Sequence, residues 1–155
     1  MTASQRLLDI QQVSVRFGGL TAVDAVSATL DAGELVGIIG PNGAGKTTFF
    51  NAISGVIVPT SGRLVVTGDD LTGKAPHRFA AHGIARTFQT PRVFADMSVG
   101  DNVRFGMQFA GRHREGPQGL RSVEEILSML GLEALAQQRA GDITPSQQRL
   151  LEIGM

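Results

Sequence analysis

Residues Gly40 to Thr48 read G-P-N-G-A-G-K-T-T, which matches the spacing G-x-x-x-x-G-K-[ST], and they directly follow the apolar run Leu35–Ile39. Glycines in such a loop allow backbone conformations that a Cβ forbids, so successive N–H groups can point toward one phosphate. The first amides of the following helix lack an intrahelical partner, and the helix dipole is positive at that end. An anion bound there satisfies both, so the stretch predicts a nucleotide-phosphate site. Its members are Gly40, Pro41, Asn42, Gly43, Ala44, Gly45, Lys46, Thr47 and Thr48.

Two side chains of this loop have predicted roles in chemistry. Lys46 is expected to reach the β- and γ-phosphates, which makes it a candidate catalytic residue, and the Thr47 hydroxyl is expected to ligate Mg²⁺. The alternative is a glycine-rich turn that only joins a strand to a helix. Strand, loop, Gly-Lys-Thr and helix occur together here, and this combination favours the phosphate site.

The composition predicts one soluble globular domain. The 155 residues are 42% hydrophobic, enough for a core, and 14 Lys and Arg residues balance 14 Asp and Glu residues. This balance gives no electrostatic case for nucleic acid or an anionic membrane surface as a partner. The absence of cysteine excludes disulfides and thiolate metal sites and fits a cytosolic location. The apolar runs are far shorter than the about 20 residues of a membrane helix, and M-T-A-S-Q-R does not resemble a signal peptide.

The residues before the loop predict a hairpin and a buried strand. Leu8–Phe17 alternates between apolar and polar and is followed by Gly18-Gly19, which predicts an antiparallel strand and its turn. Ala22–Leu30 is expected to be the partner strand. Leu35–Ile39 is apolar throughout, as is typical of a parallel strand buried on both faces. The inward faces of the first two strands are expected to carry Val13, Val15 and Phe17, and Val26, Ala28 and Leu30, with Ser14 and Arg16 pointing outward.

The residues after the loop predict a further helix and two strands. The loop helix is expected to end near Ser54, with Gly55 beyond it, and to bury Phe49, Phe50 and Ile53. Arg63–Thr67 and Ile84–Phe88 are expected to be strands, with a helix at Pro76–His82 between them. Gly68-Asp69-Asp70 is interpreted as a hairpin turn and not as a magnesium-orienting carboxylate, because Gly68 precedes the acids and another turn sequence follows.

Three later helix starts are indicated by capping spacings. Ser98 to Asp101 reads S-x-x-D and Ser122 to Glu125 reads S-x-x-E, while Thr144 to Gln147 reads T-x-x-Q with Pro at the first helical position. Gly111–Gly119 is interpreted as a linker. The histidines have no metal-ligand spacing and are interpreted as ordinary surface residues; they are His77, His82 and His113.

Five stretches together resemble the ATP-binding subunit of an ABC transporter, and within that superfamily the branched-chain amino acid importer branch. They are V-S-V-R-F-G-G-L-T-A-V from Val13, the phosphate loop, P-T-S-G from Pro59, A-R-T-F-Q-T-P-R-V-F from Ala85, and S-Q-Q-R-L-L-E-I-G-M from Ser146. The resemblance covers nearly the whole chain. It implies an α/β fold, namely a P-loop NTPase (RecA-like) core with an N-terminal antiparallel β subdomain and a helical subdomain. The single nucleotide-binding domain is expected to divide into residues 1–95 and 96–155.

The resemblance implies roles for three further places. Phe17 is expected to stack on the adenine ring of ATP, although burial in the core would also explain a phenylalanine at a strand end. Gln89 falls at the family's glutamine loop, where the side-chain carbonyl approaches Mg²⁺ and the backbone contacts the membrane subunit, so it is expected to act in catalysis and metal binding. The family's L-S-G-G-Q signature, which faces ATP on the opposite subunit, corresponds to Thr144, Ser146 and Gln147.

The chain departs from the family pattern in two ways. Ser146 stands where the signature has glycine, and its side chain crowds the close approach that glycine permits. The sequence also stops at Met155, before the family's strand ending in Asp, its water-polarising Glu and its switch histidine. The fold is therefore expected to be C-terminally incomplete, and the chain alone is expected to lack ATPase turnover.

The leading functional hypothesis is an ATP-binding and ATP-hydrolysing importer subunit that uses ATP and Mg²⁺. Its expected partners are integral membrane subunits and a second ATP-binding subunit, identical or not, on the cytoplasmic face of the membrane, and its expected cargo is branched-chain or related amino acids. Another P-loop enzyme is the first alternative. A GTPase would need N-K-x-D, which the sequence lacks, and a kinase would need a basic lid, for which Arg112, His113 and Arg114 are a poor substitute. A nucleotide-binding regulatory fragment without turnover is the third.

Overall fold

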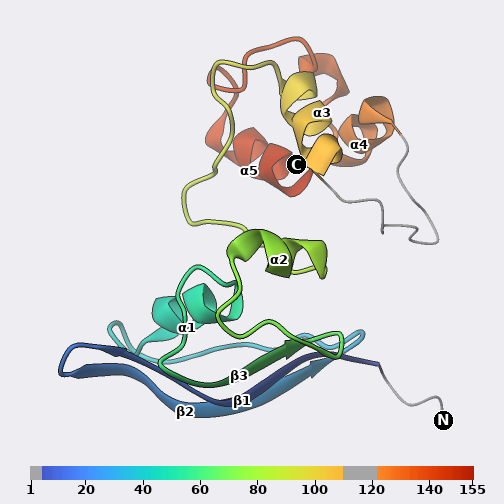
Figure 1. Ribbon diagram of the computed structural model, residues 1–155. Coiled ribbons are helices and arrows are strands. Elements are labelled where there is room, and N and C mark those ends of the chain that lie inside the picture. The colour runs from blue at the N-terminus through green and yellow to red at the C-terminus, as the bar shows by residue number, and fades with distance from the viewer. Residues whose placement is uncertain (1–4, 110–121) are drawn as a thin grey trace. The chain divides into compact units, whose positions relative to one another are not determined.

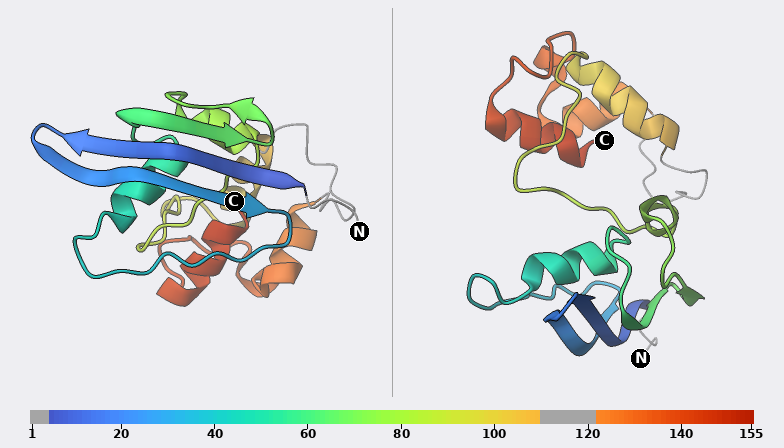
Figure 2. Two further views of the ribbon diagram at one scale, coloured as in Figure 1. Left: turned by 90° about the horizontal axis from the view of Figure 1, so that it is seen from below. Right: turned by 60° about the vertical axis from the view of Figure 1, so that its left-hand side comes forward.

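The chain begins with a four-stranded antiparallel sheet in the computed structural model, which describes residues 5–109 and 122–155 (Figure 1). Strands β1 (Arg6–Phe17), β2 (Leu20–Asp31), β3 (Ser61–Val66) and β4 (Asp69–Asp70) lie in the order β2-β1-β3-β4 (Figure 2). Strands β1 and β2 form the predicted hairpin, which closes where Phe17 faces Leu20. The chain forms two compact units, Met1–Ala85 and Arg86–Met155, and the sheet belongs to the first.

The buried face of β1 changes phase at a β-bulge. Leu8 and Ile10 are buried at even-numbered positions, whereas Val13 and Val15 are buried at odd-numbered ones. Gln12, with a φ of 50°, marks the place where β1 carries one more residue than β2 and β3 opposite it. The bulge lets both pairs of side chains face one core.

Two residues fit the sheet to its bulges. A Cβ on Gly62 would lie 2.4 Å from the carbonyl oxygen of Gln12, so only glycine allows β3 to approach there. Ser14, predicted to point outward, is buried instead, because its hydroxyl accepts the amide hydrogen of Ala25 at 2.9 Å where β2 has its own bulge. Strict alternation could not place Ser14, because the bulges reset the pleat.

Helices α1 (Lys46–Ile53) and α2 (Pro76–Ala81) complete the first unit. α1 packs on β1 and β2 and is followed by Gly55 with a φ of 73°, as predicted. Phe50 was expected to be buried but is 46% exposed, because this short helix faces the core with Phe49, Ala52 and Ile53. The core contains Leu8, Ile10, Val13, Val15, Val23, Phe49, Ala52, Leu64, Val66, Leu71 and Phe79.

Two strand predictions are wrong. Neither Leu35–Ile39 nor Ile84–Phe88 belongs to a sheet, since β1 to β4 are the strands of the described residues. A strand exists only through hydrogen bonds to a neighbour, and no described segment pairs with either stretch. The apolar run is consequently uncovered, with Leu35 99% exposed and Ile39 95% exposed.

The second unit is helical. Its elements are α3 (Val99–Phe109), α4 (Val123–Leu130), the short 3₁₀ helix η1 (Glu133–Leu135) and α5 (Pro145–Ile153). α3 packs on both α4 and α5. Their common core contains Val99, Val103, Leu127, Leu132, Ala140, Ile143 and Leu151. Within the described part of the chain, no helix is long and apolar enough to cross a membrane.

The predicted caps of these helices are confirmed. The hydroxyls of Ser98, Ser122 and Thr144 accept the amide hydrogens of Asp101, Glu125 and Gln147 at 3.0, 3.1 and 3.3 Å. At α5 the Gln147 side chain also accepts the Thr144 amide hydrogen at 2.9 Å, which completes a capping box. The predicted linker Gly111–Gly119, with Arg112, His113 and Arg114, lies outside the described residues.

A buried asparagine ties the segment before α3 to that helix. Asn102 is 0% exposed, and its Oδ1 accepts the Phe94 amide hydrogen at 2.8 Å. Its Nδ2 donates to the carbonyl oxygens of Phe94 and Ser98 at 3.1 and 2.9 Å. All hydrogen-bonding groups of this amide face a partner, as a buried polar side chain requires.

We expect Asn102→Ala to lower the free energy of unfolding by about 2 kcal/mol, because the Phe94 N–H loses its acceptor at a partly buried place. Chemical denaturation followed by circular dichroism measures the change. Gln108→Ala, at an exposed position of the same helix, is the control and should stay within about 0.5 kcal/mol of the parent. Equal losses in the two variants would contradict a stabilising role of the Asn102 hydrogen bonds.

The uncovered apolar run should make the chain self-associate with increasing concentration, since exposed apolar patches favour association. Replacing Leu35 and Ile39 with Lys should shift the distribution toward monomer in sedimentation velocity. Leu20→Lys changes a single exposed residue, 66% accessible, outside the run and should leave association unchanged. Association that resists the double change would show that another surface is responsible.

Candidate nucleotide-binding site

The phosphate loop is held against the sheet by one close contact. Gly43 and Gly45 have φ values of 84° and 83°, which glycine adopts readily and other residues rarely do. A Cβ on Gly45 would lie 2.1 Å from the Ala22 carbonyl oxygen and 3.7 Å from Cγ2 of Val23. The sequence places glycine here because the loop must pass directly over β2.

The first turn of α1 has the features of an anion site. Its N-cap, Gly45, supplies no side-chain hydrogen bond, and the turn contains no acidic residue. The starts of α4 and α5, by comparison, are capped by Ser122 and Thr144. The leading amides of α1 therefore remain for an anion, at the positive end of the helix dipole.

Lys46 lies across this loop. Its ammonium group donates to the carbonyl oxygens of Gly40 and Pro41 at 2.7 and 2.6 Å. These two hydrogen bonds hold the ammonium group at the loop, where the motif requires it. Thr47 next to it is exposed, and Thr48 is half-buried.

Phe17 belongs to the same unit as the loop and is 50% exposed. It ends β1 opposite Leu20, and two residues earlier Val15 faces Val23, the residue beneath Gly45. The end of the hairpin and the phosphate loop are thus tied to the same short stretch of β2. An exposed ring at this place fits an aromatic surface for a base better than a core residue.

The two aspartates after β3 have partners in the sheet and at the residue that follows α2. Asp70 accepts from Arg63 at 2.8 Å and pairs with Val65, as the predicted hairpin requires. Hydrogen bonds from Thr72, and then from Arg63, lower the pKa of Asp70 to about 2. Oδ2 of Asp69 lies 3.1 Å from Nε2 of His82. This histidine, predicted to be an ordinary surface residue, is half-buried and connects the end of α2 to β4.

The donor set of the first unit fits a phosphate chain better than a protein-bound metal ion. The glycine loop, the uncapped helix start and Lys46 all favour an anion. Within residues 5–109 and 122–155 no three His, Cys, Asp or Glu side chains gather as metal ligands. A magnesium ion that arrives with phosphate oxygens needs few protein ligands, and the Thr47 hydroxyl fits that role.

The remaining predicted residues lie in the second unit. Gln89 is exposed, and its carbonyl oxygen accepts from Nη2 of Arg149 at 2.6 Å. Thr144 and Gln147 form the capping box of α5, and Ser146 is exposed in its first turn. Arg149 was not predicted to act at this place; the only signal was that it lies three residues before Glu152, on the same face of the expected helix.

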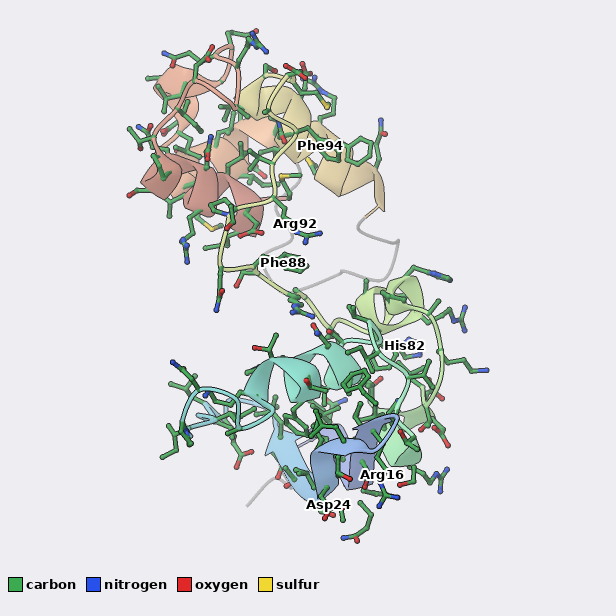
Figure 3. The ribbon with its side chains drawn as sticks, turned by 90° about the vertical axis from the view of Figure 1, so that its left-hand side faces the viewer. Arg16, Asp24, His82, Phe88, Arg92 and Phe94 are labelled. Carbon is green, nitrogen blue, oxygen red and sulfur yellow. The ribbon has the colours of Figure 1, made fainter. Side chains whose placement is uncertain are left out.

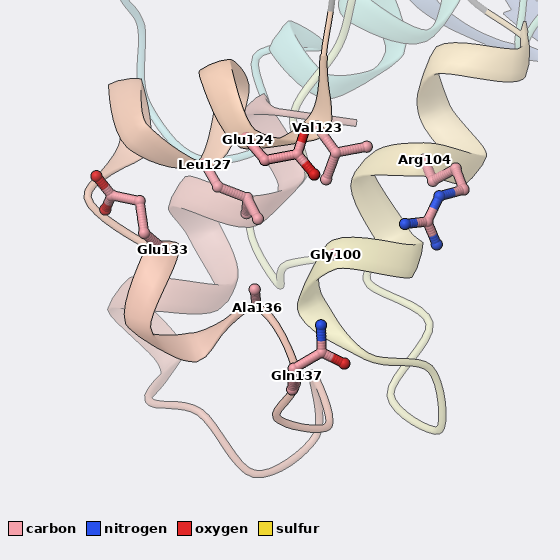
Figure 4. A pocket seen from close by; sticks show the side chains of 8 residues that line it. All are labelled: Gly100, Arg104, Val123, Glu124, Leu127, Glu133, Ala136 and Gln137. Carbon is pink, nitrogen blue, oxygen red and sulfur yellow. The ribbon is translucent and has the colours of Figure 1, made fainter.

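A separate hollow of about 130 Å³ lies in the second unit between α3, α4 and η1 (Figure 4). Arg104 at its edge is paired with Asp101 on its own helix. None of the predicted site residues lines this hollow, whose lining consists of Gly100, Arg104, Val123, Glu124, Leu127, Glu133, Ala136 and Gln137.

Comparisons with known proteins agree with the loop chemistry. The ABC transporter family model matches residues 23–155. The "High-affinity branched-chain amino acid transport ATP-binding protein" BraF of Pseudomonas aeruginosa is 34% identical, over 97% of this chain and 64% of its own length. LivG of Escherichia coli, with the same description, is 36% identical over the same shares. This chain therefore spans about two thirds of these relatives, 64% in each case.

Solved structures show the same fold. The ADP conformation of MJ1267, an ATP-binding cassette of an ABC transporter, superimposes with a TM-score of 0.80 and 33% identity. The match covers 96% of this chain and 63% of that one. It confirms the predicted P-loop NTPase fold with an antiparallel β subdomain. The chain belongs to the ABC transporter family, and its residues form part of that family's ATP-binding domain.

Proposed function

We propose that this chain binds Mg-ATP at Gly40–Thr48 as the nucleotide-binding portion of an importer's ATP-binding subunit. The observation that carries the proposal is the uncapped start of α1 beneath a glycine loop, with the Lys46 ammonium group lying on that loop. Amides and ammonium together offer several donors to one phosphate chain in a fixed arrangement. No charge on the whole chain is needed, because the attraction is local.

The roles within the site follow from its geometry. Lys46 would exchange its loop carbonyls for β- and γ-phosphate oxygens, and the Thr47 hydroxyl would hold Mg²⁺, which neutralises phosphate charge when it is bound. Phe17 would stack on the adenine, since its ring is half exposed and its strand end is tied to the loop through β2. Catalysis would rest on positioning and charge neutralisation.

The residues of the second unit would act in an assembled transporter. Gln89 would approach the metal, and Thr144, Ser146 and Gln147 would face ATP on a second ATP-binding subunit. The capping box supports this, because it fixes the start of α5 while leaving Thr144 and Ser146 exposed. We further propose that the assembly includes integral membrane subunits and that the chain lies at the cytoplasmic face.

The cargo we propose is branched-chain or related amino acids. The support is the description of BraF and LivG, which are 34% and 36% identical to this chain. The residues of the phosphate site do not indicate which solute is transported. Transport of such amino acids by a strain that depends on this protein would test the assignment.

Binding without turnover is the second candidate function. It is favoured by the state of Asp69 and Asp70, whose carboxylates are engaged by His82 and by Arg63 with Thr72. Phosphoryl transfer by this family of sites needs a carboxylate to orient the metal and a positioned water. The described residues therefore support nucleotide binding more directly than hydrolysis.

Lys46→Ala should weaken Mg-ATP binding at least about tenfold, since a charged hydrogen bond contributes about 1.5–3 kcal/mol. Isothermal titration calorimetry measures the affinity. Lys74→Ala removes an exposed lysine from outside the loop and is the matched control. If both variants bind like the parent, the loop is structural and the proposal is wrong.

Phe17→Ala should weaken ATP and ADP by the same factor, about fivefold, because stacking on the base is common to both nucleotides. Phe17→Tyr should be nearly neutral. Leu20→Ala, at the position paired with Phe17 across the hairpin, controls for changes in the strand end. A loss of thermal stability without a loss of affinity would return Phe17 to the core.

A further inference from the structure

Helix α5 holds the backbone of residues 89–92 at two points. Nη2 of Arg149 donates to the Gln89 carbonyl oxygen at 2.6 Å, and Oε1 of Glu152 accepts the Arg92 amide hydrogen at 3.2 Å. Arg149 and Glu152 are three residues apart and therefore share a face of the helix. One face of α5 thus binds both ends of a four-residue segment.

Side-chain contacts also link this segment to the residues just before it. The Phe88 ring is contacted by two guanidinium groups, with Arg86 at 4.8 Å and Arg92 at 4.2 Å from its centroid. Figure 3 shows Arg92 beside the Phe88 ring. A guanidinium group over an aromatic face is attracted to it electrostatically. By comparison, the Gln89 side chain is exposed and makes no hydrogen bond to the described residues. The backbone at residue 89 is therefore fixed, while the side-chain amide of Gln89 is exposed to a ligand.

A glutamate at position 152 lowers the stability of the fold in one respect. Its Oε2 is buried and has no hydrogen-bond partner among the described residues. Burial of a carboxylate oxygen without a partner destabilises a fold, and an apolar side chain would avoid this cost. The structural gain that offsets it is the hydrogen bond from Oε1 to Arg92.

We propose that Arg149 and Glu152 are positioning residues that fasten Gln89 to helix α5. This helix begins at the Thr144 capping box, so Gln89 and the signature-like residues Thr144–Gln147 move as one body. A displacement at Gln89 is then passed to the start of α5 without intervening loops. The inference rests on the proposed role of Gln89 near the metal, but the fastening itself is a property of the second unit.

Hydrogen exchange in the full chain tests the fastening directly. Glu152→Leu removes the acceptor and should speed exchange of the Arg92 amide at least about tenfold, because that amide loses its hydrogen bond. Glu152→Gln keeps an acceptor oxygen and should retain protection. Ile153→Ala, at the exposed neighbouring position, is the matched control. Unchanged exchange in Glu152→Leu would overturn the proposal, and its global stability, measured in parallel, separates local release from unfolding.

A second measurement connects the fastening to nucleotide binding. The gain in ATP affinity that magnesium gives should be about tenfold smaller in Arg149→Ala than in the parent. The affinity for ATP without magnesium should be unchanged. Arg149→Lys should recover part of the gain. Gln89→Ala should give the same loss, and the double variant no more, since both changes act on one interaction. Additive losses would overturn the positioning role.

The two proposals fail in different ways. If Lys46→Ala leaves ATP binding unchanged, the proposed function is wrong, although the Arg92 amide would still respond to Glu152→Leu. If Lys46→Ala weakens binding but the Arg92 amide ignores Glu152, the proposed function stands and the fastening is wrong.

Discussion

The contact between Gly45 and the Ala22 carbonyl is the constraint on which the phosphate site depends. It leaves no room for a Cβ, sets the height of the loop above β2, and fixes where α1 starts. The same strand carries Val23 into the core and faces the end of β1 that bears Phe17. The loop, the helix and the aromatic ring are therefore arranged by one stretch of β2. The antiparallel hairpin thus supports the phosphate loop and is not only a layer of the fold.

Local chemistry explains what the sequence could predict. The hairpin, the glycine after α1 and the caps at Ser98, Ser122 and Thr144 each depend on residues a few positions apart, and all were confirmed. The same holds for the hairpin interpretation of Asp69 and Asp70. In each case the partner atoms lie within reach of any chain with that sequence, so no tertiary information is needed.

Predictions failed where the outcome depends on a distant partner. Leu35–Ile39 has the composition of a buried strand, yet a strand needs a neighbour that composition cannot supply. Asn102 gave no signal, because its three bonds reach Phe94 and Ser98 only once α3 has formed. Arg149 and Glu152 could be placed on one helix face, but not against Gln89 and Arg92, which lie 60 residues earlier. The role of the phosphate loop stays a prediction, which the sequence alone allows because the motif contains its own donors.

The bulge at Gln12 makes three strands interdependent. Its amide hydrogen is accepted by the Ser27 hydroxyl on β2 at 3.0 Å, and its carbonyl oxygen occupies the space that a side chain at position 62 of β3 would need. The extra residue, the hydroxyl and the missing side chain form a matched set. Shortening β1 by one residue there would keep Val13 and Val15 on the buried face by simple alternation. Position 27 would then no longer need a hydroxyl, and position 62 would no longer need glycine. These three positions are thus expected to change together, or not at all, as the family diverges.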